Sequence, residues 1–126
     1  MAVLASPAFA EEVACPPSIS VKESLEQPAP DKWSVRIDTS ARYLAGVSFF
    51  DGDPKEAKSI APVRDFPLSG KDRVALWNFG PSGEPVWLAC RYLDTGISLS
   101  RQLSSSYKEC RVTYGAGGIV KAIACK

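Results

Sequence analysis

Apolar and polar residues alternate over several short stretches, the pattern of strands with one buried face. The clearest stretch is residues 33–37, with the sequence Trp-Ser-Val-Arg-Ile. A longer apolar stretch occupies residues 43–50, and a weaker alternation occupies residues 18–25. We expect a strand in each of these three segments.

The second half of the chain continues as strand-like segments separated by turn residues. Further strands are expected at residues 74–79, 85–92, 97–103, 110–114 and 119–125. The sequence Gly-Pro-Ser-Gly at residues 80–83 predicts a hairpin turn between the first two of these. Turns about ten residues apart are typical of sandwiches and small barrels. The pattern therefore predicts a mainly β fold, either a small antiparallel sandwich or a barrel-like sheet.

One short helix is predicted within this β pattern. Asp53 is a good N-cap, Pro54 suits the first helical position, and Glu56 falls at the third. These three residues predict a helix near residues 54–59. Asp51 and Asp53 resemble the start of a calcium loop, but the later ligands of such a loop are missing, so capping is the favoured interpretation.

The first ten residues have features of an export signal. Ala8-Phe9-Ala10 is a small-x-small pattern for signal peptidase, and Pro7 lies just upstream. A basic region is absent and the apolar part is short, so we expect residues 1–10 to be the remnant of a longer signal. Residues 11–126 are then predicted to be a single β-rich domain, located in the periplasm or secreted.

The four cysteines support an oxidising compartment. Cys15, Cys90, Cys110 and Cys125 include no C-x-x-C pair and the chain has no histidine, so two disulfides are expected rather than a zinc site. The favoured pairing is nested, Cys15–Cys125 with Cys90–Cys110. In a regular meander, however, Cys90 and Cys110 would lie about 9.5 Å apart, beyond the roughly 7 Å limit of a disulfide. Either the segment between these two cysteines leaves the sheet, as the serine run at residues 104–106 suggests, or Cys110 pairs with Cys125 across a hairpin.

Charge and composition exclude several classes of function. The net charge is +1 over 126 residues and no histidine is present, so nucleic-acid binding and histidine-dependent catalysis are not expected. No apolar stretch is long enough to span a membrane. We expect no metal and no cofactor.

Three aromatic residues are candidates for recognition. Phe49 and Phe50 are adjacent and must point to opposite faces of a strand, so one of them is a candidate for an exposed position. In residues 86–92 both faces are partly apolar. Either this strand is covered on both sides, which is the favoured interpretation, or Trp87 lies on an exposed binding face.

The sequence favours an exported, non-enzymatic binding module, such as an inhibitor, immunity or recognition protein of the cell envelope. Its expected partner is another protein or an envelope component. One alternative is a small-ligand carrier with a β-barrel cavity. A carboxylate-dependent hydrolase and a purely structural envelope protein are further alternatives.

Overall fold

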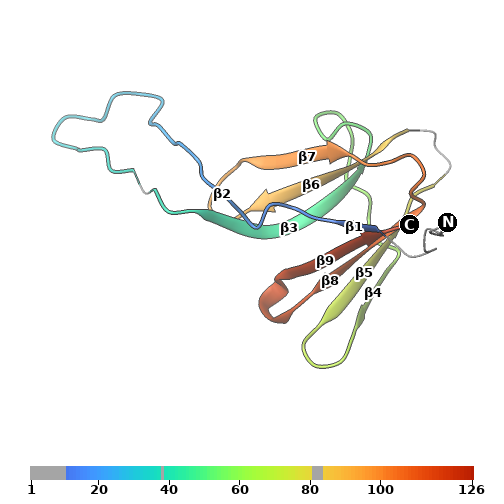
Figure 1. The fold of residues 1–126 in the computed structure, drawn as a ribbon. Coiled ribbons are helices and arrows are strands. Elements are labelled where there is room, and N and C mark those ends of the chain that lie inside the picture. Colours follow the sequence, from blue (N-terminus) through green and yellow to red (C-terminus); the bar gives the residue numbers. More distant parts are fainter. Residues whose placement is uncertain (1–10, 38, 81–83) are drawn as a thin grey trace, which may run out of the picture.

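The chain forms two antiparallel β-sheets, seen in a computed structural model that describes residues 11–37, 39–80 and 84–126 (Figure 1). In this part of the chain the strand orders are β1-β9-β8-β5-β4 and β2-β3-β6-β7. The strands are β1 (Glu11–Val13), β2 (Ser18–Ile19), β3 (Arg42–Asp51), β4 (Arg64–Pro67), β5 (Arg73–Asn78), β6 (Val86–Tyr92), β7 (Ser98–Gln102), β8 (Glu109–Tyr114) and β9 (Val120–Cys125). A short 3₁₀ turn, η1 (Ala116–Gly118), joins β8 to β9. The predicted mainly β fold is confirmed.

The chain crosses repeatedly from one sheet to the other. Strand β3 belongs to the four-stranded sheet, β4 and β5 to the five-stranded one, β6 and β7 to the first again, and β8 and β9 to the second. In Figure 1 the two sheets lie one above the other, and their strands run in different directions. Among the described residues, no further sheet covers the side of the four-stranded sheet that faces away from the five-stranded one.

The core lies between the two sheets. Phe49 of β3 and Leu88 of β6 are direct cross-strand neighbours, and both are fully buried. The Phe49 ring lies 4.8 Å from the Trp77 ring of the opposite sheet. The indole N–H of Trp77 donates to the carbonyl oxygen of Ile60 at 2.9 Å, so this buried polar group is satisfied. Burial of each large side chain here contributes roughly 1.5–3 kcal/mol.

All four cysteines are paired, but the nested pairing predicted from the sequence is wrong. The bridges are Cys15–Cys90 and Cys110–Cys125. After β7 the chain leaves the four-stranded sheet, so Cys90 and Cys110 lie in opposite sheets. Cys110 instead faces Cys125 directly across the β8–β9 pair, with the two Cα atoms 4.1 Å apart. The cross-hairpin alternative for this pair is the correct one.

Residues 20–41 form a long connection that we call the arm. It joins β2 to β3 and extends beyond the ends of the strands, away from both sheets (Figure 1). The prediction of a half-buried strand at residues 33–37 is wrong, because this segment belongs to neither sheet and is exposed. The strand predicted at residues 18–25 is reduced to the two residues of β2.

The helix predicted near residues 54–59 is a single turn. Asp53 begins it as expected: its Oδ1 accepts a hydrogen bond from the Lys55 N–H at 3.0 Å, and its carbonyl oxygen accepts from the Glu56 N–H at 2.9 Å. The turn ends because Ser59 forms a bridge with Phe50, and the Ile60 N–H donates to the Phe49 carbonyl oxygen at 2.7 Å. Pairing with β3 therefore replaces further helical hydrogen bonds.

The predicted signal remnant, residues 1–10, lies outside the described residues. Within the described ranges, no helix has the length and apolar character needed to cross a bilayer.

Candidate partner-binding surface

The two adjacent phenylalanines occupy opposite sides of β3. Phe49 is fully buried against Trp77, so of the two residues it is the one that faces the core. Phe50 points to the other side, where it is the direct cross-strand neighbour of Trp87. Both Phe50 and Trp87 are half-buried and lie outside the core cluster. The structure thus brings two of the three predicted aromatic residues together.

These two rings belong to a surface that we call the outer face. It is the side of the four-stranded sheet turned away from Trp77. Strand pairing places on it Ser48, Phe50, Trp87, Ala89, Arg91, Ser100 and Gln102. The strand β6 is central in its sheet but, in the described part of the chain, no second layer lies over this side. Trp87 therefore lies, half-buried, on a side of β6 that no described layer covers, and its role in binding stays a prediction.

Small side chains make the middle of the outer face shallow. Ala89 is flanked across the neighbouring strands by Ser48 and Ser100. Trp87 lies beside Gln102 of β7, whose five residues are all exposed. Among the described strands β7 pairs with β6 alone, so its other edge is free. The outer face therefore combines one aromatic end with a flat polar centre and an open strand edge.

The other end of the outer face carries a positioned arginine. Arg91 lies opposite Gly46, and its Nη2 donates to the Val47 carbonyl oxygen at 3.2 Å. A Cβ built on Gly46 would lie only 2.7 Å from this Nη2, so the absence of a side chain at Gly46 makes room for the guanidinium. Tyr43 and Leu93, which are 63% and 53% exposed, lie next along the same side. Sequence reasoning missed Arg91, although the alternation along β6 placed it on the face of Trp87.

A hollow of about 470 Å³ adjoins the aromatic end of the outer face. Gln102 is part of the outer face and also lines this hollow, and the apolar lining includes Phe79, Val86 and Tyr107. A smaller hollow of about 150 Å³ lies beside Cys15.

Two tyrosines have perturbed acidity. Burial raises the pKa of Tyr92, whose hydroxyl donates to the Pro16 carbonyl oxygen at 2.8 Å. Burial also raises the pKa of Tyr114, where the charge of Arg91 acts in the lowering direction and that of Asp65 in the raising direction. The Tyr92 hydrogen bond fixes the chain between β1 and β2 to the four-stranded sheet.

The arm holds the most exposed aromatic residue. Trp33 is 74% exposed, and Val35 and Ile37 are about half exposed. The sequence signal for this surface is weak, because alternation alone does not distinguish a half-buried strand from a free one. The nearby Pro28 and Pro30 were the only indication of a segment outside a sheet.

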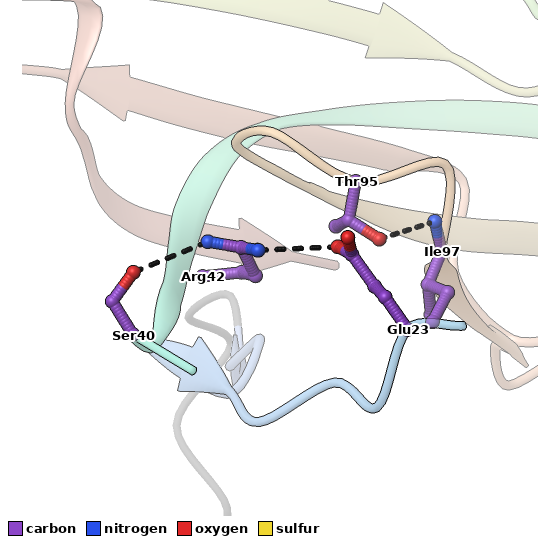
Figure 2. A network of polar contacts seen from close by, with 5 residues as sticks. All are labelled: Glu23, Ser40, Arg42, Thr95 and Ile97. Atoms are coloured by element: carbon purple, nitrogen blue, oxygen red, sulfur yellow. Dashed lines mark hydrogen bonds and ion pairs between the residues drawn. The ribbon is translucent and has the colours of Figure 1, made fainter. Parts of the chain in front are cut away.

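The base of the arm is closed by Arg42, the first residue of β3 (Figure 2). Arg42 is 7% exposed. Its Nη2 donates to Glu23 Oε1 at 3.1 Å, and its Nη1 donates to Ser40 Oγ at 3.2 Å. Figure 2 shows the guanidinium between the outgoing and returning limbs of the arm, near the turn that holds Thr95 and Ile97. The limbs are thus joined at the body of the protein, and the arm begins beyond that point.

Several carboxylate and hydroxyl groups that could act in catalysis make ion pairs or hydrogen bonds with neighbouring side chains. Asp65 pairs with Arg73 at 2.6 Å, and Asp72 pairs with Lys121 at 2.8 Å. In the serine run, Ser104 Oγ lies 2.8 Å from Ser106 Oγ. Among the described residues, no group of three or more histidine, cysteine, aspartate or glutamate side chains has the arrangement of a metal site.

Two comparisons with known proteins give matches. Residues 38–126 match the model of the family described as "Type VI secretion system Tli immunity protein". Over 116 residues the chain is 33% identical to the "Uncharacterized 16.3 kDa protein in trpG 5'region" of Azospirillum brasilense, covering 86% of this chain and 75% of that relative. No solved structure matches significantly. The family match includes every strand from β3 to β9 and begins within the arm.

Proposed function

This chain belongs to the Tli immunity protein family of the type VI secretion system, and from that premise we propose that it is a non-enzymatic periplasmic protein that binds and blocks a type VI toxin through its outer face. Membership in an immunity family implies a protein partner. The identity of the contact surface and the compartment are our proposal.

The observation that carries the choice of surface is the Phe50–Trp87 pair. The two residues are direct cross-strand neighbours and remain partly exposed, although the core lies on the opposite side of the same strands. Aromatic residues and arginine dominate the energetics of protein interfaces. Trp87 and Phe50 at one end of the outer face and Arg91 at the other supply both kinds of anchor around a flat centre of small side chains.

The disulfides support the periplasm as the location. Both bridges close within one chain, and no cysteine is free. Such bridges form and persist in oxidising compartments. The export signal at residues 1–10 stays a prediction from the sequence.

A protection experiment tests this function. Each toxin secreted by the type VI system of the source bacterium is produced in the periplasm of a sensitive host, with and without the immunity protein. We expect the native protein to restore growth against one toxin and to bind it in a 1:1 complex. The double variant Phe50→Ala/Trp87→Ala should bind that toxin at least about 30-fold more weakly, since interface hot spots are worth about 2 kcal/mol or more.

The matched control is Ile119→Ala, which truncates a 65%-exposed apolar residue beside β9, on the other sheet. This variant should protect as well as the native protein. Failure of the native protein to bind or neutralise any of the toxins would overturn the function. Equal protection by the native protein and the Phe50/Trp87 double variant would overturn the assignment of the outer face.

A further inference from the structure

The arm contains a strand-like segment without a sheet. Trp33, Val35 and Ile37 are apolar at every second position and are 74%, 53% and 50% exposed. Ser34 and Arg36 alternate with them and are also exposed. Within the described ranges, the main-chain groups of residues 34–37 make no backbone hydrogen bond. The segment thus exposes three apolar side chains together with main-chain groups that make no described backbone hydrogen bond.

The tip of the arm fixes where this segment starts. The Trp33 N–H donates to the Pro30 carbonyl oxygen at 2.9 Å, which closes a turn. Lys32 within that turn has a φ of 72°, a left-handed conformation that is uncommon for a residue with a side chain. Non-glycine residues held in this region concentrate at binding sites, where the surrounding structure fixes them. The turn directs the chain back toward the body, beginning at Trp33.

The base of the arm fixes its other end. Arg42 is bonded to Glu23 on one limb and Ser40 on the other. Directly after Arg42 comes Tyr43, which lies on the same side of the sheet as the outer face, beside Leu93. Tyr43 and Leu93, both exposed, therefore lie between the base of the arm and the outer face.

We propose that residues 33–37 bind the toxin by strand addition: they pair with the free edge of a β-sheet in the toxin, and Trp33, Val35 and Ile37 cover apolar side chains of that sheet. This inference rests on the proposed function, because it names a second contact with the same partner. It predicts that the toxin has an unpaired sheet edge within reach of the surface that contacts Phe50 and Trp87.

The chemistry of the segment favours a protein edge over a lipid surface. A sheet edge satisfies the main-chain groups of residues 34–37 and covers one side of the segment only. Lipid tails offer no hydrogen-bond partner to these groups. The exposed charges of Asp31, Lys32 and Arg36 would also have to stay in water. A second copy of this chain, adding the arm to its free β7 edge, is the competing protein occupant.

The test uses the full disulfide-bonded protein and the purified toxin that it neutralises in the protection experiment. The affinity of the native protein is compared with those of Trp33→Ser/Ile37→Ser and of Arg36→Ser, the latter on the polar side of the same segment. We expect the double variant to bind at least about 30-fold more weakly and the Arg36 variant to stay within about threefold. All three should have the same melting temperature, because the substituted side chains lie outside the core.

Hydrogen exchange distinguishes strand addition from contact by side chains alone. The amides of residues 34–37 should exchange rapidly in the free protein and become protected in the complex. Unchanged affinity of the double variant, or amides that stay unprotected in the complex, would overturn the inference while the native protein still binds. Absence of binding by the native protein is seen before any variant is used, and it overturns the proposed function itself.

Two further measurements identify the competing occupants. A dimer of the native protein that the Trp33/Ile37 variant lacks would assign the arm to a second copy and overturn the proposal. Flotation of the native protein, but not of the variant, with phosphatidylethanolamine–phosphatidylglycerol vesicles would assign it to a lipid surface, with the same consequence.

Discussion

Arg42, the first residue of β3, forms an ion pair of 3.1 Å with Glu23 on the outgoing limb of the arm. The arginine side chain is 9% exposed and the glutamate 49%, so the contact joins a buried cation to a half-exposed anion. Removal of Glu23 would leave the charge of Arg42 with less compensation in a buried place, a change that costs more than the loss of a surface pair.

This relationship predicts two graded effects. Glu23→Gln, which keeps an acceptor oxygen, should lower the free energy of unfolding by about 0.5–1 kcal/mol, and Glu23→Ala by about 1–3 kcal/mol. Both variants should be cut faster by trypsin after Lys32 and Arg36, because the limbs are no longer held together. The control is Asp65→Asn, which weakens the exposed Arg73 pair on β4–β5. An equal increase in arm cleavage in that control would contradict the role of Arg42.

Truncation to alanine should affect mainly the stability of the protein at Phe49 and mainly its toxin binding at Phe50. Phe49→Ala empties a fully buried position and should lower the free energy of unfolding by about 3–5 kcal/mol. Phe50→Ala, on the half-buried outer face, should cost less than about 1.5 kcal/mol and should mainly weaken toxin binding. Urea unfolding gives the first quantity and calorimetric titration the second. A larger stability loss for Phe50 would show that the sides of β3 have been assigned wrongly.

The disulfide pairing is testable by mass. The oxidised protein should be four hydrogens lighter than the reduced protein. Non-reducing digests should contain the peptide pairs Cys15–Cys90 and Cys110–Cys125. In the chain-entropy model, loss of the first bridge should cost about 4.5 kcal/mol and loss of the second about 3 kcal/mol, because the first closes the longer loop. A peptide joining Cys15 to Cys125 would contradict the structure.

Gly46→Ala should change the outer face more than the stability. The new methyl group would meet Arg91 Nη2 at 2.7 Å, and this atom is the far end of a flexible side chain. We expect the guanidinium to move and to lose its bond to the Val47 carbonyl oxygen, at a cost of about 1 kcal/mol or less. Toxin affinity should then fall by the same factor as in Arg91→Ala. Additive losses in the Gly46/Arg91 double variant would show that the two residues act separately.

Alkaline pH should destabilise the protein through its buried tyrosines. Burial raises the pKa of Tyr92 and of Tyr114 above the ordinary value of 10.0. The unfolded chain therefore loses these protons at lower pH than the folded protein. Their contribution to stability is complete below pH 10 and is lost as the pH rises through the folded-state values. Tyr92→Phe/Tyr114→Phe should have a shallower decline of unfolding free energy above pH 10, and an unchanged slope would refute this origin.

The alternation of apolar residues predicted strands β3 and β5 to β9, but it missed β1 and β4. Phe49 and Phe50 were correctly expected on opposite sides of their strand, because successive side chains of a strand point to opposite faces. The same alternation gave a wrong prediction for residues 33–37, because it does not show whether another strand is available for pairing. The cysteine pairing also depended on such long-range information: only the crossing from β7 to β8 between the sheets separates Cys90 from Cys110.

The candidate site was predictable in part for the same reason. Phe50 and Trp87 were found because an aromatic residue on a strand must face one side or the other. Their direct pairing depends on the register of β3 against β6, which the bulge between Leu44 and Gly46 shifts by one residue. The contact that closes the arm joins Arg42 to Glu23, which is 19 positions earlier in the sequence, and no local sequence pattern predicts it.

The pairing of β1 with β9 affects when folding can be completed. Glu11 lies opposite Cys125, so almost the whole described chain separates the two partners. Strand β1 is synthesised early, and its pairing partner β9 becomes available only when the C-terminal strand has been made. Pairings over such distances in sequence close late in folding. A chain that stops short of β9 lacks both the neighbour of β1 and the bonding partner of Cys110, so only finished molecules reach the native fold.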